Sequence, residues 1–324
     1  MKPIERFLRE TDRVPLMPMP TPLHPMHYQP SGKDVSLLIK RDDMTGVGPG
    51  GNKIRSLEFL LGEARSKGAS KILAAGPEQS NLCALTAAAC AKAGLDCELI
   101  INAAEPARKE GNLLLEELLG TKIHFLGPCD GAVRNRRMEK LAAAYQSAGE
   151  QVYVVRNGAT TGRGALGYTA AVVEMKRQCE DLGIGRMTIF APGGNGGVAA
   201  GLIYGNQLMG QPFRIVIEDD RETLTAHIRS TISEAEEITG LPMNVPVEQA
   251  AEITDAYRGG GWGENTEESQ QAVLSFARSE GIFIENVYTS KVLVGMMDWI
   301  EQEKVSGPVC YLHTGGLGSL FAQY

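Results

Sequence analysis

The chain has 324 residues, of which 43% are hydrophobic and 22% charged, so it can bury a sizeable core and is long enough for about two domains. This composition excludes disordered and fibrous proteins. Lysine and arginine total 32 against 39 acidic residues, which gives a net charge of −7. No sustained basic stripe offers the phosphate neutralisation that a nucleic-acid partner requires, so none is expected.

The sequence predicts neither a membrane span nor a metal site. No run of about 18 apolar residues is present, and the N-terminus is charged and then proline-rich rather than apolar. The six cysteines are spread out, with no CxxC pair and no histidine at ligand spacing, which fits reduced thiols. We therefore expect a soluble, cytoplasmic protein without zinc or another metal.

Strand and helix patterns alternate along most of the chain. Apolar runs predict a strand over 35–40 and then strands over 71–75, 97–101, 122–125 and 151–155. Helical spacing separates them, over 57–67, 82–93, 109–119 and 132–148. A second series follows, with strands over 187–191, 213–217 and 309–313. This alternation predicts two α/β domains with parallel sheets, flanking helices and a cleft between them.

Glycine is over-represented, at 38 residues or about 12% of the chain, against a usual value of ~7%. The excess is local and lies beside the predicted elements. Because glycine lets a backbone approach a ligand closely, these clusters indicate candidate binding loops. The clusters cover residues 46–51, 158–167, 193–201, 259–263 and 315–318.

The first candidate loop ends in Gly50, Gly51, Asn52 and Lys53, directly before a predicted helix. Asn52 is a natural N-cap. The positive end of the helix dipole repels an ammonium group and lowers the pKa of Lys53, which favours the neutral amine that Schiff-base chemistry needs. A glycine turn with a solvent-facing lysine is the alternative.

The second loop follows the strand over 71–75 and contains Gln79, Ser80 and Asn81 before a helix rich in small residues. Hydroxyl and amide groups at a helix N-terminus can bind a carboxylate. A simple capping sequence is the alternative.

The third loop follows the strand over 187–191 and is the strongest of the signals. Strand, glycine-rich loop and helix form the arrangement that presents main-chain N–H groups to a phosphate. The loop also satisfies GxGxxA through Gly194, Gly196 and Ala199, and Glu218 follows roughly 20 residues later, as in a dinucleotide fold. Against a nicotinamide cofactor, that fingerprint normally opens the first βα unit, whereas here it lies in the second half of the chain.

A last cluster lies near the C-terminus, where Tyr288 and Thr289 precede Lys291, and Thr314 follows the strand over 309–313. A hydroxyl at the end of a strand can hydrogen-bond a heteroaromatic nitrogen. An ordinary turn is the alternative, because threonine and glycine are common in turns.

Taken together, these loops resemble the pyridoxal-phosphate enzymes of fold type II, in particular the group with D-cysteine desulfhydrase and 1-aminocyclopropane-1-carboxylate deaminase. The resemblance covers nearly the whole chain and implies a tryptophan synthase beta-like fold. The motifs that carry it are residues 39–43, 50–53 with Arg55, Leu57 and Glu58, 79–81, 164–168, 194–202, 287–289 with Lys291, and 313–316.

The resemblance implies a role for each site residue. Lys53 would hold pyridoxal 5'-phosphate through a Schiff base and then act as the base at the α-carbon. Asn81 would contact the ring hydroxyl, Ser80 the substrate carboxylate, and Thr314 the pyridine nitrogen. The implied catalytic residues are Lys53, Ser80 and Tyr288. The implied cofactor-binding residues are Asn52, Lys53, Asn81, Gly194, Asn195, Gly196, Gly197, Val198 and Thr314. The implied substrate-binding residues are Gln79, Ser80, Asn81, Trp262, Tyr288 and Thr289.

One position separates the two family activities. In the deaminases the residue after the tyrosine tends to be glutamate, whereas this chain has Thr289, as the desulfhydrases do. A neutral hydroxyl at the ring nitrogen also makes the ring a weaker electron sink, which suits prompt β-elimination. We therefore expect an α,β-elimination on a small amino acid, with D-cysteine desulfhydrase-like release of pyruvate, ammonia and sulfide.

Three departures from the family pattern leave alternatives open. Leu82 and Ala84 stand where histidine and arginine are usual, Trp262 replaces a pocket tyrosine, and residues 77–78 add a carboxylate. A cysteate sulfo-lyase releasing sulfite and a 1-aminocyclopropane-1-carboxylate deaminase are alternatives. A non-catalytic protein that binds the cofactor or a dinucleotide is the alternative of another class.

The resemblance also implies a discontinuous domain arrangement. Residues 56–156 would form a small domain inserted into a larger cofactor-binding domain made of 1–55 and 157–324. Homodimers are usual in the family, so we expect one here.

Overall fold

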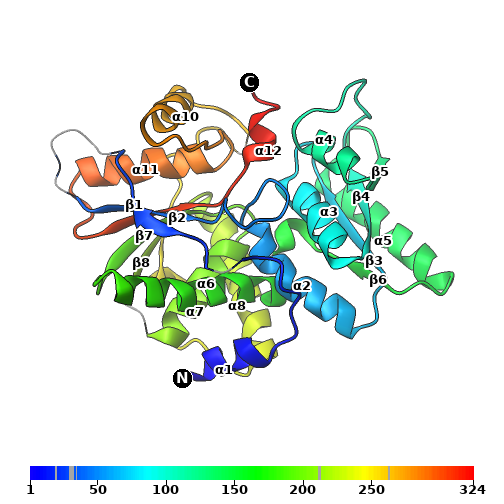
Figure 1. Ribbon diagram of the computed structural model, residues 1–324, viewed down its shortest axis with the longest axis horizontal. Coiled ribbons are helices and arrows are strands. Elements are labelled where there is room, and N and C mark those ends of the chain that lie inside the picture. Colours follow the sequence, from blue (N-terminus) through cyan, green and yellow to red (C-terminus); the bar gives the residue numbers. More distant parts are fainter. Residues whose placement is uncertain (19, 29–32, 34, 211–212, 262) are drawn as a thin grey trace.

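The computed structural model describes residues 1–18, 20–28, 33, 35–210, 213–261 and 263–324. It contains two largely parallel sheets with helices packed on them (Figure 1). The large sheet has the strand order β1-β2-β10-β7-β8-β9, and the small sheet has the order β5-β4-β3-β6. Among the strands that the structure describes, β1 and β2 pair antiparallel and the other pairs are parallel. The predicted α/β class with flanking helices is confirmed.

The small sheet comes from one continuous stretch of chain. Its two faces bury separate apolar clusters, one against α2 and α3 and the other against α5. Its strands are β3 (Lys71–Gly76), β4 (Asp96–Ile101), β5 (Lys122–Phe125) and β6 (Val152–Val154), and its helices are α2 (Lys53–Ser66), α3 (Asn81–Ala93), α4 (Gly111–Leu118) and α5 (Gly131–Ser147). The predicted elements agree with these to within a few residues.

The large sheet combines both ends of the chain. β2 and β10 pair in parallel with Leu37 opposite Val309, although they are far apart in sequence. Its strands are β1 (Leu23–Pro25), β2 (Leu37–Arg41), β7 (Met187–Pro192), β8 (Phe213–Glu218), β9 (Glu252–Thr254) and β10 (Val309–His313). The domain limits at residues 56 and 156 stay a prediction.

Helices cover both faces of the large sheet. Figure 1 shows α10 and α11 on one face and α6, α7 and α8 on the other, and each set encloses its own apolar cluster. The helices are α1 (Pro3–Glu10), α6 (Gly162–Asp181), α7 (Gly197–Met209), α8 (Arg221–Thr239), α9 (Val247–Ala250), α10 (Glu267–Glu280), α11 (Thr289–Glu301) and α12 (Leu317–Leu320), with a short 3-10 turn at Asn157–Ala159.

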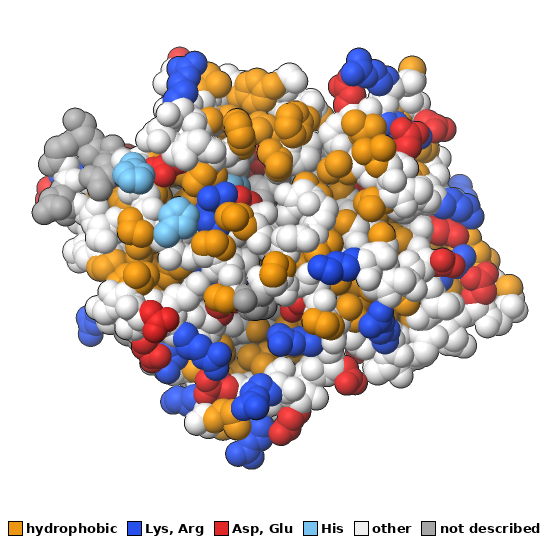
Figure 2. All heavy atoms as spheres, viewed as in Figure 1, with side chains coloured by type: hydrophobic (Ala, Val, Ile, Leu, Met, Phe, Trp, Pro, Cys, Tyr) orange, Lys and Arg blue, Asp and Glu red, His pale blue; other side chains and the backbone are white. Residues whose placement is uncertain are grey.

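The surface in this view is mixed in charge. Figure 2 shows lysine and arginine side chains interspersed with acidic ones, with no extended patch of one sign among the described residues on this face. Within the described part of the chain, no helix is both long and apolar enough to cross a bilayer.

Part of the glycine excess serves helix packing rather than ligand binding. The glycines of residues 162–167 lie in α6, where a Cβ on Gly167 would come within 2.5 Å of the Arg55 backbone. A Cβ on Gly201 in α7 would lie 2.3 Å from the carbonyl oxygen of Ala165. Glycine therefore lets α6 pack closely against both α2 and α7, and the prediction of a ligand loop over 158–167 is corrected for its helical part.

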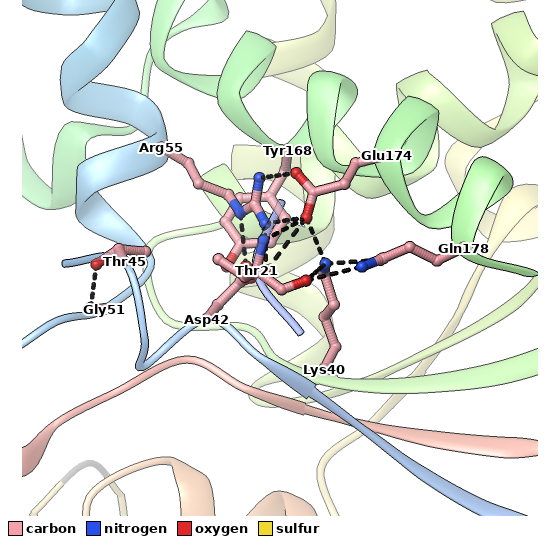
Figure 3. A network of polar contacts seen from close by, with 9 residues as sticks. All are labelled: Thr21, Lys40, Asp42, Thr45, Gly51, Arg55, Tyr168, Glu174 and Gln178. Carbon is pink, nitrogen blue, oxygen red and sulfur yellow. Dashed lines mark hydrogen bonds and ion pairs between the residues drawn. The ribbon is translucent and has the colours of Figure 1, made fainter. Parts of the chain in front are cut away.

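A buried ionic network joins three of these elements (Figure 3). Arg55 on α2 donates from Nε and Nη2 to the carboxylate of Asp42, which follows β2, over 2.8 Å each. It also donates over 3.0 Å to both oxygens of Glu174 on α6. Lys40 on β2 completes the set through an ion pair with Glu174. Two cations therefore face two anions, all of them buried.

Neutral groups satisfy the remaining oxygens of the network. The hydroxyls of Tyr168 and Thr21 each donate to the Asp42 carboxylate over 2.7 Å. The Arg55 guanidinium, with these hydroxyls and Lys40, outweighs the cost of burial and holds the pKa of Asp42 at about 2. Asp42 is therefore ionised under all ordinary conditions and ties α2 to the end of β2.

We predict that Asp42→Asn destabilises the protein by about 3–5 kcal/mol, because it leaves a buried arginine without one of its counter-charges. Urea unfolding followed by circular dichroism measures this. Glu303→Gln is the control, because its ion pair with Lys33 lies on the surface and its loss should hardly move the midpoint. Equal midpoints for both variants would contradict a structural role for the network.

Candidate active site

A cavity of about 590 Å³ lies between the two sheets, at the carboxyl ends of β3, β7 and β10. Most of the predicted site residues line it, although they come from five separate segments of the chain. These are Asn52, Lys53, Gln79, Ser80, Asn81, Gly194, Asn195, Gly197, Val198, Tyr288 and Thr314. The predicted convergence of the candidate loops at one cleft is thus present in the structure.

Lys53 is the first residue of α2, and β10 fixes its position. The Thr314 carbonyl accepts a hydrogen bond from the Asn52 amide over 2.9 Å, and Gly51 forms an isolated bridge with Gly315. Gly315 has φ +98°, and a Cβ there would lie 2.7 Å from Gly51 Cα. Only glycine allows the two backbones to approach this closely. Asn52 is the N-cap residue of α2, as predicted, but its side chain makes no capping bond.

The Lys53 amine faces the cavity without a hydrogen bond or ion pair to a described residue. Desolvation lowers the pKa of Lys53 from its usual value to about 8. The predicted direction of this shift is correct, but burial is its cause in the structure. About a tenth of the amine is therefore neutral, and nucleophilic, at pH 7, far more than for an ordinary lysine.

The loop after β3 presents the N-terminus of α3 to the cavity. Ser80 caps this helix, since its hydroxyl accepts a hydrogen bond from the Cys83 amide over 3.2 Å. Asn112 on α4 holds the loop from behind, because its Nδ2 donates to the side-chain oxygen of Asn81 over 2.9 Å. The main-chain N–H of Asn112 donates to the side-chain oxygen of Gln79 over 2.8 Å. The Gln79 amide group is thus engaged by α4, which makes it a support of the loop.

The loop after β7 presents main-chain N–H groups to the cavity at the start of α7. Gly194 and Gly196 adopt φ values of +53° and +93°, which turn the chain sharply before the helix. The main-chain N–H groups of Asn195, Gly197 and Val198 bond to no other described residue. Together with the helix dipole, these donors suit a phosphate. Gly196 itself lies behind the cavity wall, against His227 and Leu224.

Thr314 and Tyr288 complete the wall on the large-sheet side. The Thr314 hydroxyl bonds to no described residue and is available to a ligand. The Tyr288 ring lies beside the Gly194 turn, since its Cε1 would be 4.0 Å from a Cβ there, and burial raises the pKa of its hydroxyl. Both residues therefore face the same cavity as the α7 loop.

Glu285 lines the cavity, and the sequence-based interpretation missed it. Its carboxylate accepts main-chain hydrogen bonds from Val287, Tyr288 and Thr289, of 2.6, 3.0 and 2.8 Å. The Thr289 hydroxyl donates to it as well, over 2.9 Å. Glu285 therefore caps α11, which begins at Thr289, and an acidic side chain four residues before a helix start is the signal that could have identified it.

Two residues predicted to bind substrate have a different status from the rest. Thr289 is buried and does not line the cavity, because its hydroxyl is engaged with Glu285. Trp262 lies outside the described residues. Arg134, on α5, lines the cavity and was not predicted.

The described residues hold no group of three His, Cys, Asp or Glu side chains that could bind a metal ion. The six cysteines are unpaired. Glu218, the acid of the alternative dinucleotide fingerprint, does not line the cavity, and burial raises its pKa to about 7.

A partly neutral lysine and a phosphate-binding loop on one cavity are the two features that a pyridoxal-phosphate enzyme of fold type II requires. Comparison with protein families agrees, because residues 14–315 match the family described as "Pyridoxal-phosphate dependent enzyme". The chain belongs to this family. Its cofactor is pyridoxal 5'-phosphate, as predicted, and the nicotinamide alternative is set aside.

Two relatives and one solved structure are similar to this chain over nearly its whole length. A "Putative 1-aminocyclopropane-1-carboxylate deaminase" of Pyrococcus horikoshii is 34% identical over 97% of this chain and 95% of its own length. A protein of the same description from Pyrococcus abyssi is 30% identical, with coverage of 98% and 96%. A crystal structure described as that of "the ACC deaminase homologue" superimposes with a TM-score of 0.90 at 32% identity, covering 98% of this chain and 96% of that one.

The residues present fit pyridoxal phosphate, so the rate at which the protein binds it should depend on the protonation state of Lys53. We predict that the rate of Schiff-base formation with added pyridoxal phosphate rises about tenfold per pH unit below pH 8 and levels off above it, because only the neutral amine attacks the carbonyl. Stopped-flow absorbance measures the rate. Lys53→Ala should show no such phase, and Lys67→Ala, an exposed lysine on the same helix, should behave as the parent. A midpoint near 10.5 would contradict the burial of Lys53.

Proposed function

We propose that the protein catalyses a pyridoxal-phosphate-dependent α,β-elimination on a small β-substituted amino acid, in the manner of D-cysteine desulfhydrase. The products would be pyruvate, ammonia and the released β-group. The observation that carries the proposal is the pairing, on one cavity, of the partly neutral Lys53 with the unengaged hydroxyl of Thr314.

When bound, pyridoxal phosphate supplies a carbonyl that condenses with amines and a ring that withdraws electrons from the α-carbon. The protein supplies binding and proton transfer. The main-chain N–H groups of Asn195, Gly197 and Val198 bind the phosphate, and the start of α3 at Ser80 binds the substrate carboxylate. Lys53 removes the α-proton on Nζ, which its lowered pKa allows near neutral pH.

The group facing the ring nitrogen favours elimination. Glu285 lies on the same cavity, but its carboxylate already accepts hydrogen bonds from the first turn of α11. The Thr314 hydroxyl has no partner among the described residues and is therefore the donor available to the pyridine nitrogen. A neutral partner withdraws less charge than a carboxylate pairing with a protonated ring, so a substrate whose β-group leaves at once is favoured.

Deamination of 1-aminocyclopropane-1-carboxylate is the second candidate. The description of both Pyrococcus relatives as deaminases of this kind supports it. Against it, position 289 carries threonine rather than the glutamate that the deaminases tend to have, and Thr289 is turned to Glu285. The small inserted domain over 56–156 and the homodimer remain proposals that follow from the family.

A product assay separates the two candidates. We predict pyruvate from at least one β-substituted amino acid among D-cysteine, L-cysteine, cysteate and β-chloroalanine, because Lys53 can take the α-proton while the β-group departs. Lactate dehydrogenase coupling measures pyruvate, and 2-oxobutyrate from the cyclopropane substrate is measured in parallel. Lys53→Ala is the inactive control. Efficient 2-oxobutyrate formation with no pyruvate from any of these amino acids would favour the deaminase.

Thr314→Ala tests the ring-nitrogen partner. We predict that turnover at saturating cofactor falls by more than tenfold, whereas the free energy of unfolding changes by only about 0.5–1.5 kcal/mol, because one neutral hydrogen bond is lost. Thr314→Ser keeps the hydroxyl and should retain most of the activity. Unchanged turnover in the alanine variant would show that another group holds the nitrogen.

A further inference from the structure

Arg134 is a buried cation on the cavity wall that the proposed function does not use. It lies in the first turn of α5 and is only 6% exposed. Its Nη1 donates to the side-chain oxygen of Asn102 over 3.0 Å, and its Nη2 donates to that of Asn157 over 3.4 Å. Its Nε has no hydrogen-bond partner among the described residues.

Both partners of Arg134 are neutral amides, so its charge is not balanced. Arg55, the other buried arginine, binds two carboxylates (Figure 3). No described carboxylate lies within ion-pair distance of Arg134. Glu116 on α4 is not its counter-ion, because neither of its oxygens has a partner and burial is the one cause that raises its pKa. A buried guanidinium of this kind is stabilised by an anionic ligand.

The two amides place Arg134 across the end of β3. Asn102 follows β4 and Asn157 follows β6, and β3 lies between these strands in the small sheet. The end of β3 leads into the loop of Ser80. On its other side, Asn157 Nδ2 donates to Asn195 in the phosphate loop over 3.3 Å. Arg134 therefore lies between the predicted carboxylate site and the predicted phosphate site.

The cavity thus has three places for negative groups: the α7 loop, the start of α3, and Arg134. The cofactor phosphate and the α-carboxylate of a simple amino acid fill the first two. A substrate with a further acidic group would fill all three. Apart from Lys53, which reacts with the cofactor, Arg134 is the one cationic side chain among the described residues that line the cavity.

We propose that Arg134 selects substrates whose β-substituent is an oxyanion, namely a sulfonate, sulfate or phosphate group. This inference rests on the proposed elimination. The planar guanidinium suits such groups, because it can donate two parallel hydrogen bonds to them. In the reaction, Lys53 takes the α-proton and the bond from Cβ to sulfur or oxygen breaks. Its electron pair leaves with sulfite, sulfate or phosphate, so no oxidant or reductant is needed.

The test compares substrates on holoenzyme variants. kcat and KM for pyruvate formation are measured with cysteate, serine O-sulfate and O-phosphoserine, in both enantiomers, and with β-chloroalanine and cysteine as substrates lacking an oxyanion. Arg134→Gln should lower kcat/KM for the oxyanion substrates about 10- to 100-fold more than for the others, mainly through KM. Arg137→Gln removes an exposed arginine one turn away on α5 and should match the parent. Arg134→Lys replaces the glutamine variant if that one does not fold.

Cofactor affinity and the pattern of kcat/KM across the substrates show which anionic group Arg134 binds. Cofactor affinity, from the visible absorbance during titration with pyridoxal phosphate, should be similar in the parent and in Arg134→Gln. A large loss would assign Arg134 to the cofactor phosphate and overturn the proposal. An equal loss of kcat/KM for every substrate would assign it to the α-carboxylate and would also overturn it, as would no loss at all.

Binding of aspartate keeps the inference testable if no substrate yields pyruvate, an outcome that defeats the proposed function alone. Aspartate carries a second acid but no β-group that can leave. The change in the cofactor spectrum gives its dissociation constant, with alanine as the comparison. Arg134→Gln should weaken aspartate binding about 10- to 100-fold relative to alanine. Equal effects on the two would refute a second acid site at Arg134.

Discussion

The ionic network around Arg55 is the interaction on which the geometry of the site depends. Arg55 lies two residues after Lys53 on α2, and it anchors the start of that helix to Asp42 after β2 and to Glu174 on α6. The contact between Gly51 and Gly315 fixes the same helix start against β10. These two constraints, one electrostatic and one steric, direct the Lys53 amine into the cavity. They also explain the glycine at position 167 in α6, because α6 must approach α2 closely for the carboxylate of Glu174 to reach Arg55.

Charged side chains inside the protein are paired in the ionic network and unpaired in the cavity. In the network, two cations and two anions balance, and hydroxyl groups satisfy the oxygens that remain. In the cavity, Lys53 and Arg134 have no counter-charge among the described residues, and the main-chain donors at the start of α7 have no acceptor. Balanced charges stabilise the fold, whereas unbalanced ones are costly to the free protein and favour ligands that supply the missing charge. The proposed phosphate contact of the cofactor and the proposed carboxylate and oxyanion contacts of a substrate would supply that missing charge.

Much of this was predictable from the sequence, for reasons that are local. The strands and helices follow from apolar periodicity, and Lys53, Ser80, Gly194 and Thr314 each stand directly at the boundary of an element, where parallel strands bring their ends together. Arg134 was not predictable in this way, because its partners Asn102 and Asn157 are distant in sequence. The same is true of Gln79, whose amide group binds α4. Glu285 and Thr289 bind each other only four residues apart, but no helix was predicted after residue 288, so their capping contact was missed. The glycines of α6 were predicted to form a loop, because the sequence does not show which helices they pack against.

The most direct test of the account is to identify the lysine that bears the cofactor. Holoenzyme is reduced with borohydride, digested and analysed by mass spectrometry. The account predicts a pyridoxyl-phosphate adduct on the peptide that contains Lys53, and no adduct on Lys53→Ala under the same conditions. An adduct on another lysine in the unaltered protein would contradict it, because the network and the β10 contact would then be directing the wrong amine into the cavity.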